Sequence, residues 1–150
     1  MKKKKVYDPR RVLQLARYNP IVDDCAVWCL ATFLGVSYER VIATSAKFDK
    51  NGGIGGLTIP KMLLVAERLG FPLQRRNKPD LEHDTGILSI DLPRQKNRGH
   101  VVVLKQGLVL DVMSGRSISL WDVDVYLSSK RARVDGILVS PLFEKEEKDS

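Results

Sequence analysis

A run of eleven residues, CAVWCLATFLG from Cys25 to Gly35, constrains this fold more than any other segment. Apolar side chains on almost every side predict a helix that is buried all round, because a surface helix would keep a polar face. Asp23 and Asp24 offer an N-cap before the run, and Gly35 suits the end of a helix. We therefore expect the rest of the chain to pack around a central helix.

Three other segments in the first half also carry helix signals. Pro9 suits the first turn of a helix that Pro20 then stops, since the residue before a proline avoids helical geometry. Ser37 and Thr58 each precede a helical pattern, and both are expected to be N-caps. Residues 49–56 hold four glycines and are expected to form a loop between the two capped helices.

The second half has the β-branched, alternating segments that are typical of strands. A short helical turn is expected over residues 120–127. Helices followed by an antiparallel sheet predict an α+β fold. The predicted strands cover residues 71–75, 86–91, 100–105, 108–112 and 134–140.

The length and composition exclude several classes of protein. With 150 residues, of which 43% are hydrophobic, the chain is expected to form one domain over residues 1–143. No apolar run approaches the roughly 18 residues that a membrane-spanning helix needs. Two cysteines cannot build a disulfide framework, and two cysteines with two histidines make a poor zinc site.

The net charge of +7 is unevenly distributed along the chain. Residues 1–7 are expected to be a frayed basic terminus, and residues 144–150 a disordered acidic tail. No apolar segment follows the first lysines, so we predict no signal peptide and expect a cytoplasmic protein. Alternatively, these lysines could be a weak electrostatic handle for nucleic acid or acidic lipid.

Cys25 is expected in the first turn of the central helix, where unpaired N–H groups and the helix dipole stabilise a thiolate. A thiolate is a nucleophile, so this position favours a catalytic cysteine. The alternative is a buried thiol that packs as a small hydrophobic group, as most cysteines outside disulfides do. Asp23 and Asp24 favour this alternative, because nearby carboxylates oppose a thiolate unless they point away.

A second candidate group lies on a predicted hairpin. His100 opens the most apolar strand directly after Gly99, and Asp111 lies inside an apolar part of the next strand. A buried carboxylate is costly without a partner. If Gln106 and Gly107 form a two-residue turn, Asp111 and His100 are diagonal neighbours on one face. A three-residue turn would put them on opposite faces.

Acyl transfer also needs a donor for the oxyanion. Asn19 precedes Cys25 by six residues, and its amide N–H could serve together with the backbone N–H of Cys25. The alternative is that Asn19 simply ends a helix before Pro20. Gln14 is a weaker candidate, since it is expected inside the first helix.

These residues and their order resemble the papain-like cysteine peptidases, and most closely the branch that removes double-glycine leader peptides from bacteriocins. That branch carries an Asp-Cys-Gly-x-x-Cys-Leu-Ala run, which residues 24–31 resemble, and a Gly-His-x-Val-Val-Leu strand, which residues 99–104 resemble. Ala26 stands where the branch has glycine, and Val112 where it has proline. Further matching segments are residues 34–38, 56–58 and 69–71, and Asp111 with Gly115.

The resemblance implies a papain-like fold and a thiol endopeptidase that acts on a peptide or protein. Cys25 would attack the peptide carbonyl, His100 would carry the proton and Asp111 would orient the imidazole. Asn19, standing where the branch has glutamine, would lie in the oxyanion hole. No metal or cofactor is implied.

Four further residues are predicted to contact the substrate, and Cys29 is not one of them. Cys29 is interpreted as a core thiol, because consecutive turns of one helix rarely suit a disulfide. For Trp28 the alternative is packing in the core, and for the glycine loop the alternative is that it is a simple connector. The predicted substrate contacts are Trp28, Gly55, Gly56 and Gly99.

Two other functions remain as alternatives to the peptidase. The first is a non-catalytic peptide-binding domain on the same scaffold, which the presence of Cys25, His100 and Asp111 together disfavours. The second is a basic nucleic-acid binder, which the chain disfavours because it lacks exposed interleaved aromatic residues and any zinc or helix-turn-helix signature.

Overall fold

The computed structural model describes residues 25–49, 57–93, 98–113 and 117–141. Within these ranges the sequence-predicted α+β class is confirmed, with three helices before the sheet and a fourth before its last strand in the chain. The first predicted helix, most of the glycine loop and both ends of the predicted domain lie outside the described residues. The helices are α2 (Cys25–Leu34), α3 (Tyr38–Ser45), α4 (Ile59–Arg68) and α5 (Val123–Lys130). The strands are β1 (Gln74–Arg76), β2 (Thr85–Leu92), β3 (Arg98–Lys105), β4 (Leu108–Met113), β5 (Ser117–Asp122) and β6 (Arg133–Val139).

Local signals decide where the helices begin and end. Ser37 Oγ accepts a hydrogen bond from the backbone N–H of Arg40 at 3.2 Å, and Thr58 Oγ1 accepts one from Lys61 at 3.3 Å. Both predicted N-caps are therefore confirmed. Gly35 follows α2 with a φ of +70°, a left-handed conformation that glycine adopts without a steric penalty.

The described strands form one antiparallel sheet in the order β1-β6-β2-β3-β4-β5. The predicted strand over residues 71–75 is shorter and later than expected. The helical turn predicted over residues 120–127 is wrong in its first part, since residues 120–122 belong to β5 and the helix begins at Val123. Pairing with β4 along the whole of β5 supplies the backbone hydrogen bonds that favour a strand there.

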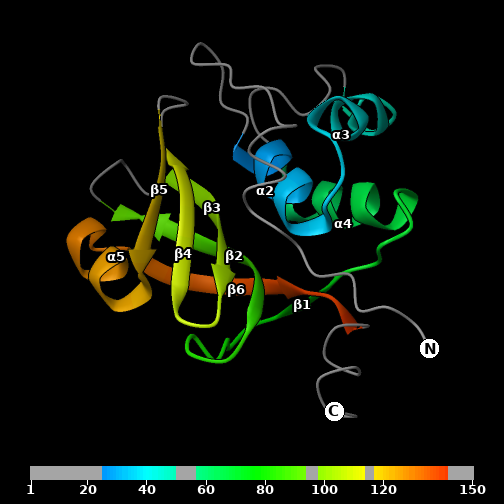
Figure 1. Ribbon diagram of the computed structural model, residues 1–150. Helices are drawn as coiled ribbons and strands as arrows, with labels where there is room; N and C mark the ends of the chain where they lie inside the picture. The colour runs from blue at the N-terminus through cyan, green and yellow to red at the C-terminus, as the bar shows by residue number, and fades with distance from the viewer. Residues whose placement is uncertain (1–24, 50–56, 94–97, 114–116, 142–150) are drawn as a thin grey trace.

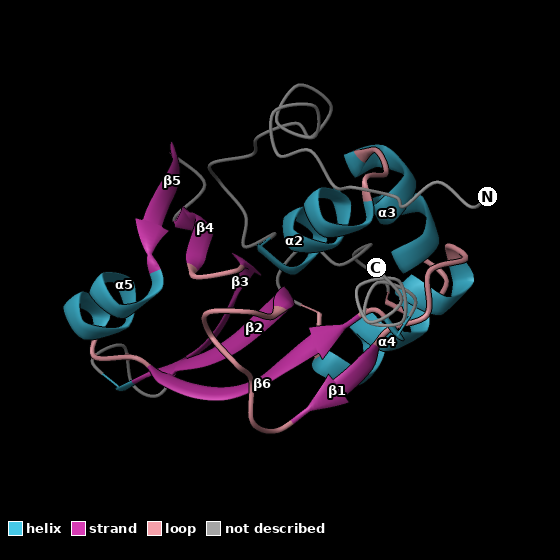
Figure 2. Cartoon of the chain, turned by 60° about the horizontal axis from the view of Figure 1, so that its bottom comes forward, coloured by secondary structure: helices cyan, strands magenta, loops and turns pink. Residues whose placement is uncertain are grey.

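The sheet separates two hydrophobic clusters. Figure 1 shows α2, α3 and α4 on one side of the strands and α5 on the other, and Figure 2 shows the same division from a second direction. Along β3, Val101 and Val103 belong to the helical cluster, whereas Val102 and Leu104 belong to the cluster beneath α5. This alternation is the ordinary period of a strand that is covered on both faces.

The α2 helix is the centre of the helical layer. Every side chain from Ala26 to Leu34 is buried, which confirms the prediction of a helix enclosed on all sides. It packs mainly against β3 and also contacts α3 and α4. Only its first residue, Cys25, is partly exposed, so the fold presents one end of a buried helix at the edge of the core.

Candidate active site

The β3–β4 hairpin has the two-residue turn on which the sequence prediction depended. Lys105 pairs with Leu108, and the pairing continues as far as Val103 and Leu110. Gln106 and Gly107 have φ values of 44° and 88°, and positive φ at both central positions is the mark of a type I′ turn. Of the two turn lengths that the sequence left open, the structure has the two-residue one, which puts His100 on the same face as its cross-strand neighbour.

That neighbour is Asp111, and the two side chains meet. His100 Nε2 lies 2.8 Å from Asp111 Oδ1, within hydrogen-bond distance. The Asp111 side chain is fully buried, and that of His100 is 9% exposed. Burial from water makes this contact stronger than the same pair at a surface, because fewer solvent dipoles screen it.

Cys25 approaches the same imidazole from α2. Its side chain interacts with the His100 ring and raises the pKa of that histidine. As the first residue of α2, Cys25 also lies beside the unpaired N–H groups of the helix start, where a negative charge is favoured.

His100 can meet partners from both sides of the sheet because of its place in β3. Strand alternation puts it on the α5 face with Val102, while α2 covers the opposite face. However, His100 is the third residue of β3, and Figure 1 shows the starts of β3 and α2 at the same end of the molecule. Neighbouring Gly99 is exposed, with open space where a Cβ would stand.

The surroundings of His100 shift its proton affinity in two opposing directions. Burial of the ring lowers its pKa, because an imidazolium loses its hydration. Interactions with Asp111, whose carboxylate is hydrogen-bonded to the ring, and with Cys25 outweigh burial, so that the pKa of His100 rises from 6.5 to about 9. The site therefore favours an imidazolium held between a sulfur and a carboxylate.

Sequence reasoning did not find a further member of this group, Tyr126 of α5. Its hydroxyl donates a hydrogen bond of 2.8 Å to Asp111 Oδ2, the carboxylate oxygen that His100 does not use. The sequence could have indicated a second donor to Asp111, because a buried carboxylate has two oxygens and both need hydrogen-bond donors. Which donor fills the second place depends on how α5 packs, and that is a tertiary contact.

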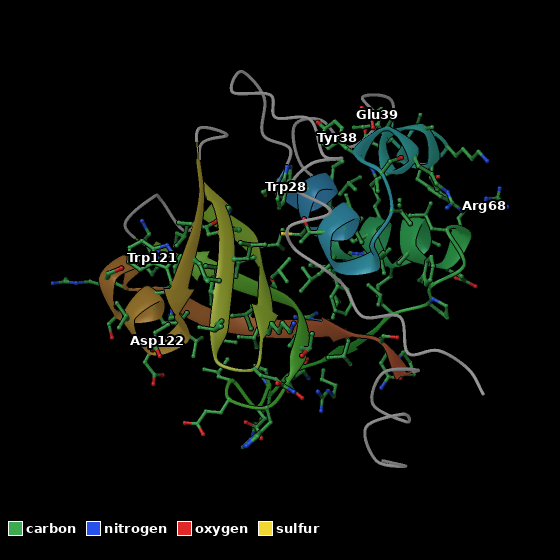
Figure 3. The ribbon with its side chains drawn as sticks, in the orientation of Figure 1. Trp28, Tyr38, Glu39, Arg68, Trp121 and Asp122 are labelled. Carbon is green, nitrogen blue, oxygen red and sulfur yellow. The ribbon has the colours of Figure 1, made fainter. Side chains whose placement is uncertain are left out.

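Other predicted site residues have varied positions. Trp28 is 1% exposed and packs in the helical cluster, on the α2 side of the sheet in Figure 3. Cys29 is buried, and its thiol donates to the carbonyl oxygen of Val101 at 3.5 Å, in keeping with the predicted core role. Three predicted site residues lie outside the described residues, namely Asn19, Gly55 and Gly56.

The described part of the chain contains neither a metal-binding group of side chains nor a membrane-spanning helix. Across those residues, no three His, Cys, Asp or Glu side chains gather in a way that could hold a metal ion. None of the described helices has the length and apolar character needed to cross a bilayer.

No protein-family model matches this chain, and no curated protein is significantly similar to it in sequence. What points to a function in this chain is its motifs and the interactions among Cys25, His100 and Asp111.

Proposed function

We propose that this chain is a papain-like cysteine peptidase that cleaves peptide or protein substrates. One observation carries the proposal, the convergence of Cys25 and the buried Asp111 on the His100 imidazole. A thiol at a helix start, an imidazole and a buried carboxylate are the three groups that nucleophilic acyl transfer requires. The motifs around Cys25 and His100, which resemble those of the leader-peptidase branch, support the same function.

Each group has a distinct role in the proposed reaction. The Cys25 thiolate attacks the carbonyl carbon of the scissile peptide bond and forms a tetrahedral intermediate. The His100 imidazolium gives its proton to the leaving amine as that intermediate collapses to a thioester. A water molecule, with His100 now acting as the base, then hydrolyses the thioester. Asp111 keeps the imidazole oriented and stabilises its positive charge.

The oxyanion requires donors near the thiol. The backbone N–H of Cys25, at the open end of α2, is one candidate, and the Asn19 amide remains the predicted second donor. Loss of such a donor costs about 10²–10³-fold in turnover. We therefore expect Asn19→Ala to lower kcat far more than it raises KM, and Asn19→Gln to retain activity.

The rival function is a peptide-binding domain without catalysis. Such a domain has no need of a thiol beside an imidazole that is bonded to a buried carboxylate. Nucleic-acid binding is the weaker rival, because it would not explain the contacts among Cys25, His100 and Asp111.

A peptide-library digest tests the proposal directly. We expect the native chain to cleave library peptides, and Cys25→Ala and His100→Ala to be folded and inactive. Cys29→Ala is the matched control, since it removes a thiol from the same helix without touching the imidazole. Cleavage that survives Cys25→Ala would refute the assignment.

Alkylation gives a readout that needs no substrate. Iodoacetamide at about pH 6 should label Cys25 and leave Cys29 unmodified, because only a thiolate reacts readily at that pH. The His100→Ala variant should lose the selective labelling. A folded native chain that fails to label Cys25 under these conditions would favour the binding domain.

A further inference from the structure

We propose that Tyr126 is a positioning residue that holds the Asp111 carboxylate against His100. The two oxygens of Asp111 have different partners: Oδ1 meets His100 Nε2 and Oδ2 accepts from the Tyr126 hydroxyl, both at 2.8 Å. Because the Asp111 side chain has no exposure to solvent, water cannot replace either contact. The carboxylate is thus fixed from two sides.

The Tyr126 hydroxyl can act only as a donor to this carboxylate. Its residue is fully buried, at 0% exposure. Burial raises the pKa of Tyr126 well above its usual value, and the neighbouring charge of Asp111 raises it further, with smaller effects from Cys29 and Cys25. The phenol therefore stays protonated wherever the protein is folded, and its proton points to Oδ2.

The end of β5 and the start of α5 hold the tyrosine ring in place. Trp121 packs against the Tyr126 ring in an edge-to-face arrangement, with 5.9 Å between centroids and 69° between planes. The indole of Trp121 is in turn anchored, since its Nε1 donates to Ser119 Oγ at 2.6 Å. The Lys130 side chain lies over the indole of Trp121, with its Nζ 5.7 Å from the ring centroid. Figure 3 labels Trp121 beside α5.

The cap of α5 adds to this rigidity. Asp122 Oδ1 accepts hydrogen bonds from the backbone N–H groups of Asp124 at 3.0 Å and Val125 at 3.4 Å, which fixes the first turn of the helix that carries Tyr126. A short, capped helix that places one hydroxyl on a buried carboxylate is what a positioning element requires.

Removing the hydroxyl should weaken the hold of Asp111 on His100. In Tyr126→Phe, Oδ2 would be buried without a donor, and the carboxylate would turn away from Nε2 or take up a proton. Either change reduces the contact that raises the proton affinity of the imidazole. The catalytic consequence rests on the proposed peptidase function, whereas the change in His100 titration does not.

Several groups face His100 and must be considered together. The α2 helix contributes Cys25, and β4 contributes Asp111, with Tyr126 of α5 behind it. On β2 the residue opposite His100 is the apolar Ile90, and Asp91 stands opposite the neighbouring glycine. Tyr126→Phe adds and removes no ionisable group that faces His100 directly, so a changed titration would come from the lost hydroxyl.

The test uses the imidazole resonances, because the chain has only two histidines. We would follow the carbon-bound ring protons of His100 and His83 by NMR against pH in the native protein and in Tyr126→Phe. The midpoint of His100 should fall by about one pH unit in the variant. His83, on an exposed turn with Asp80, is the internal control and should not move. Tyr38→Phe removes a hydroxyl from a buried tyrosine of α3 and is the matched control variant.

Kinetics supply the second readout. Loss of a hydrogen bond to a charged group should lower kcat about 10- to 100-fold with little change in KM, and the alkaline limb of the pH–rate profile should shift to lower pH. Should Tyr126→Phe fail to fold, Trp121→Phe keeps the hydroxyl but loosens its support, and a smaller shift of the His100 midpoint is expected in the same direction.

The outcomes separate this inference from the proposed function. A His100 midpoint that stays unchanged or rises in the folded variant overturns the positioning role, whatever the native chain cleaves. A lowered midpoint in a protein without peptidase activity upholds the role of Tyr126 and overturns the proposed function instead.

Discussion

Raising the pH through the titration range of His100 should destabilise this protein. The imidazolium is favoured in the fold, with a pKa of about 9 against 6.5 for an unperturbed histidine. Its stabilising effect is therefore complete below about pH 6.5 and is lost as the pH rises through about 9. A difference of about 2.5 pH units, at about 1.4 kcal/mol for each, corresponds to about 3 kcal/mol. The low exposure of the His100 side chain, 9%, keeps solvent screening small.

Chemical denaturation at a series of pH values measures this effect. We expect the free energy of unfolding to fall by about 3 kcal/mol between pH 6 and pH 9.5, a large part of the usual stability of a small domain. The pKa of His83 is also raised, by its exposed contact with Asp80, so the measurement should be made in a His83→Gln background. In that background, His100→Gln should remove most of the slope and lower the stability at pH 6.

The contribution of the thiol can be separated from that of the carboxylate. Cys25→Ala should retain the part of the slope that comes from Asp111, because that contact is independent of the sulfur. If the unfolding free energy of the His83→Gln protein were flat or rising between pH 6.5 and 9, the imidazolium would not be favoured in the fold. The electrostatic account of the site would then be wrong.

Three further predictions concern activity and packing. Asp111→Asn should leave the fold intact and lower kcat by about 10⁴-fold, because the introduced amide favours the wrong imidazole tautomer; a steady-state assay with near-native kcat would contradict this. Cys29→Ser should stay active but lose about 1–3 kcal/mol of stability, since a hydroxyl is costlier to bury than the thiol beneath Val101; an inactive folded protein would mean that the nucleophile is misassigned. Gly86→Ala should lower the thermal midpoint, because its Cβ would lie 2.3 Å from the carbonyl oxygen of Leu138; an unchanged midpoint would argue against the close approach of β2 and β6.

Local elements were predictable because their causes lie within a few residues. Ser37 and Thr58 each cap a helix by accepting a hydrogen bond from the backbone N–H three residues further along the chain. Gly107 and the preceding glutamine set the hairpin register, and the register alone brings His100 and Asp111 to one face. In each case the chain needs no distant partner to adopt the geometry.

Elements that depend on distant partners were missed or misplaced. The residues of β5 were expected partly in a helical turn, and only the free edge of β4 makes them a strand. The short β1, Gln74–Arg76, is bounded by the length over which β6 can pair with it. Propensity is a weak guide at such positions, because the backbone partner decides the outcome.

The sequence by itself determined the residue types of the site and the buried α2, and it indicated a hairpin between His100 and Asp111 but left two lengths open for its turn. Only the tertiary structure decided that Cys25, 75 positions earlier in the chain, interacts with the same imidazole. It also decided that Tyr126 fills the second place on the carboxylate. Spacing along a strand or helix follows from backbone geometry, whereas contacts between layers follow from how buried surfaces pack, and that depends on the whole chain at once.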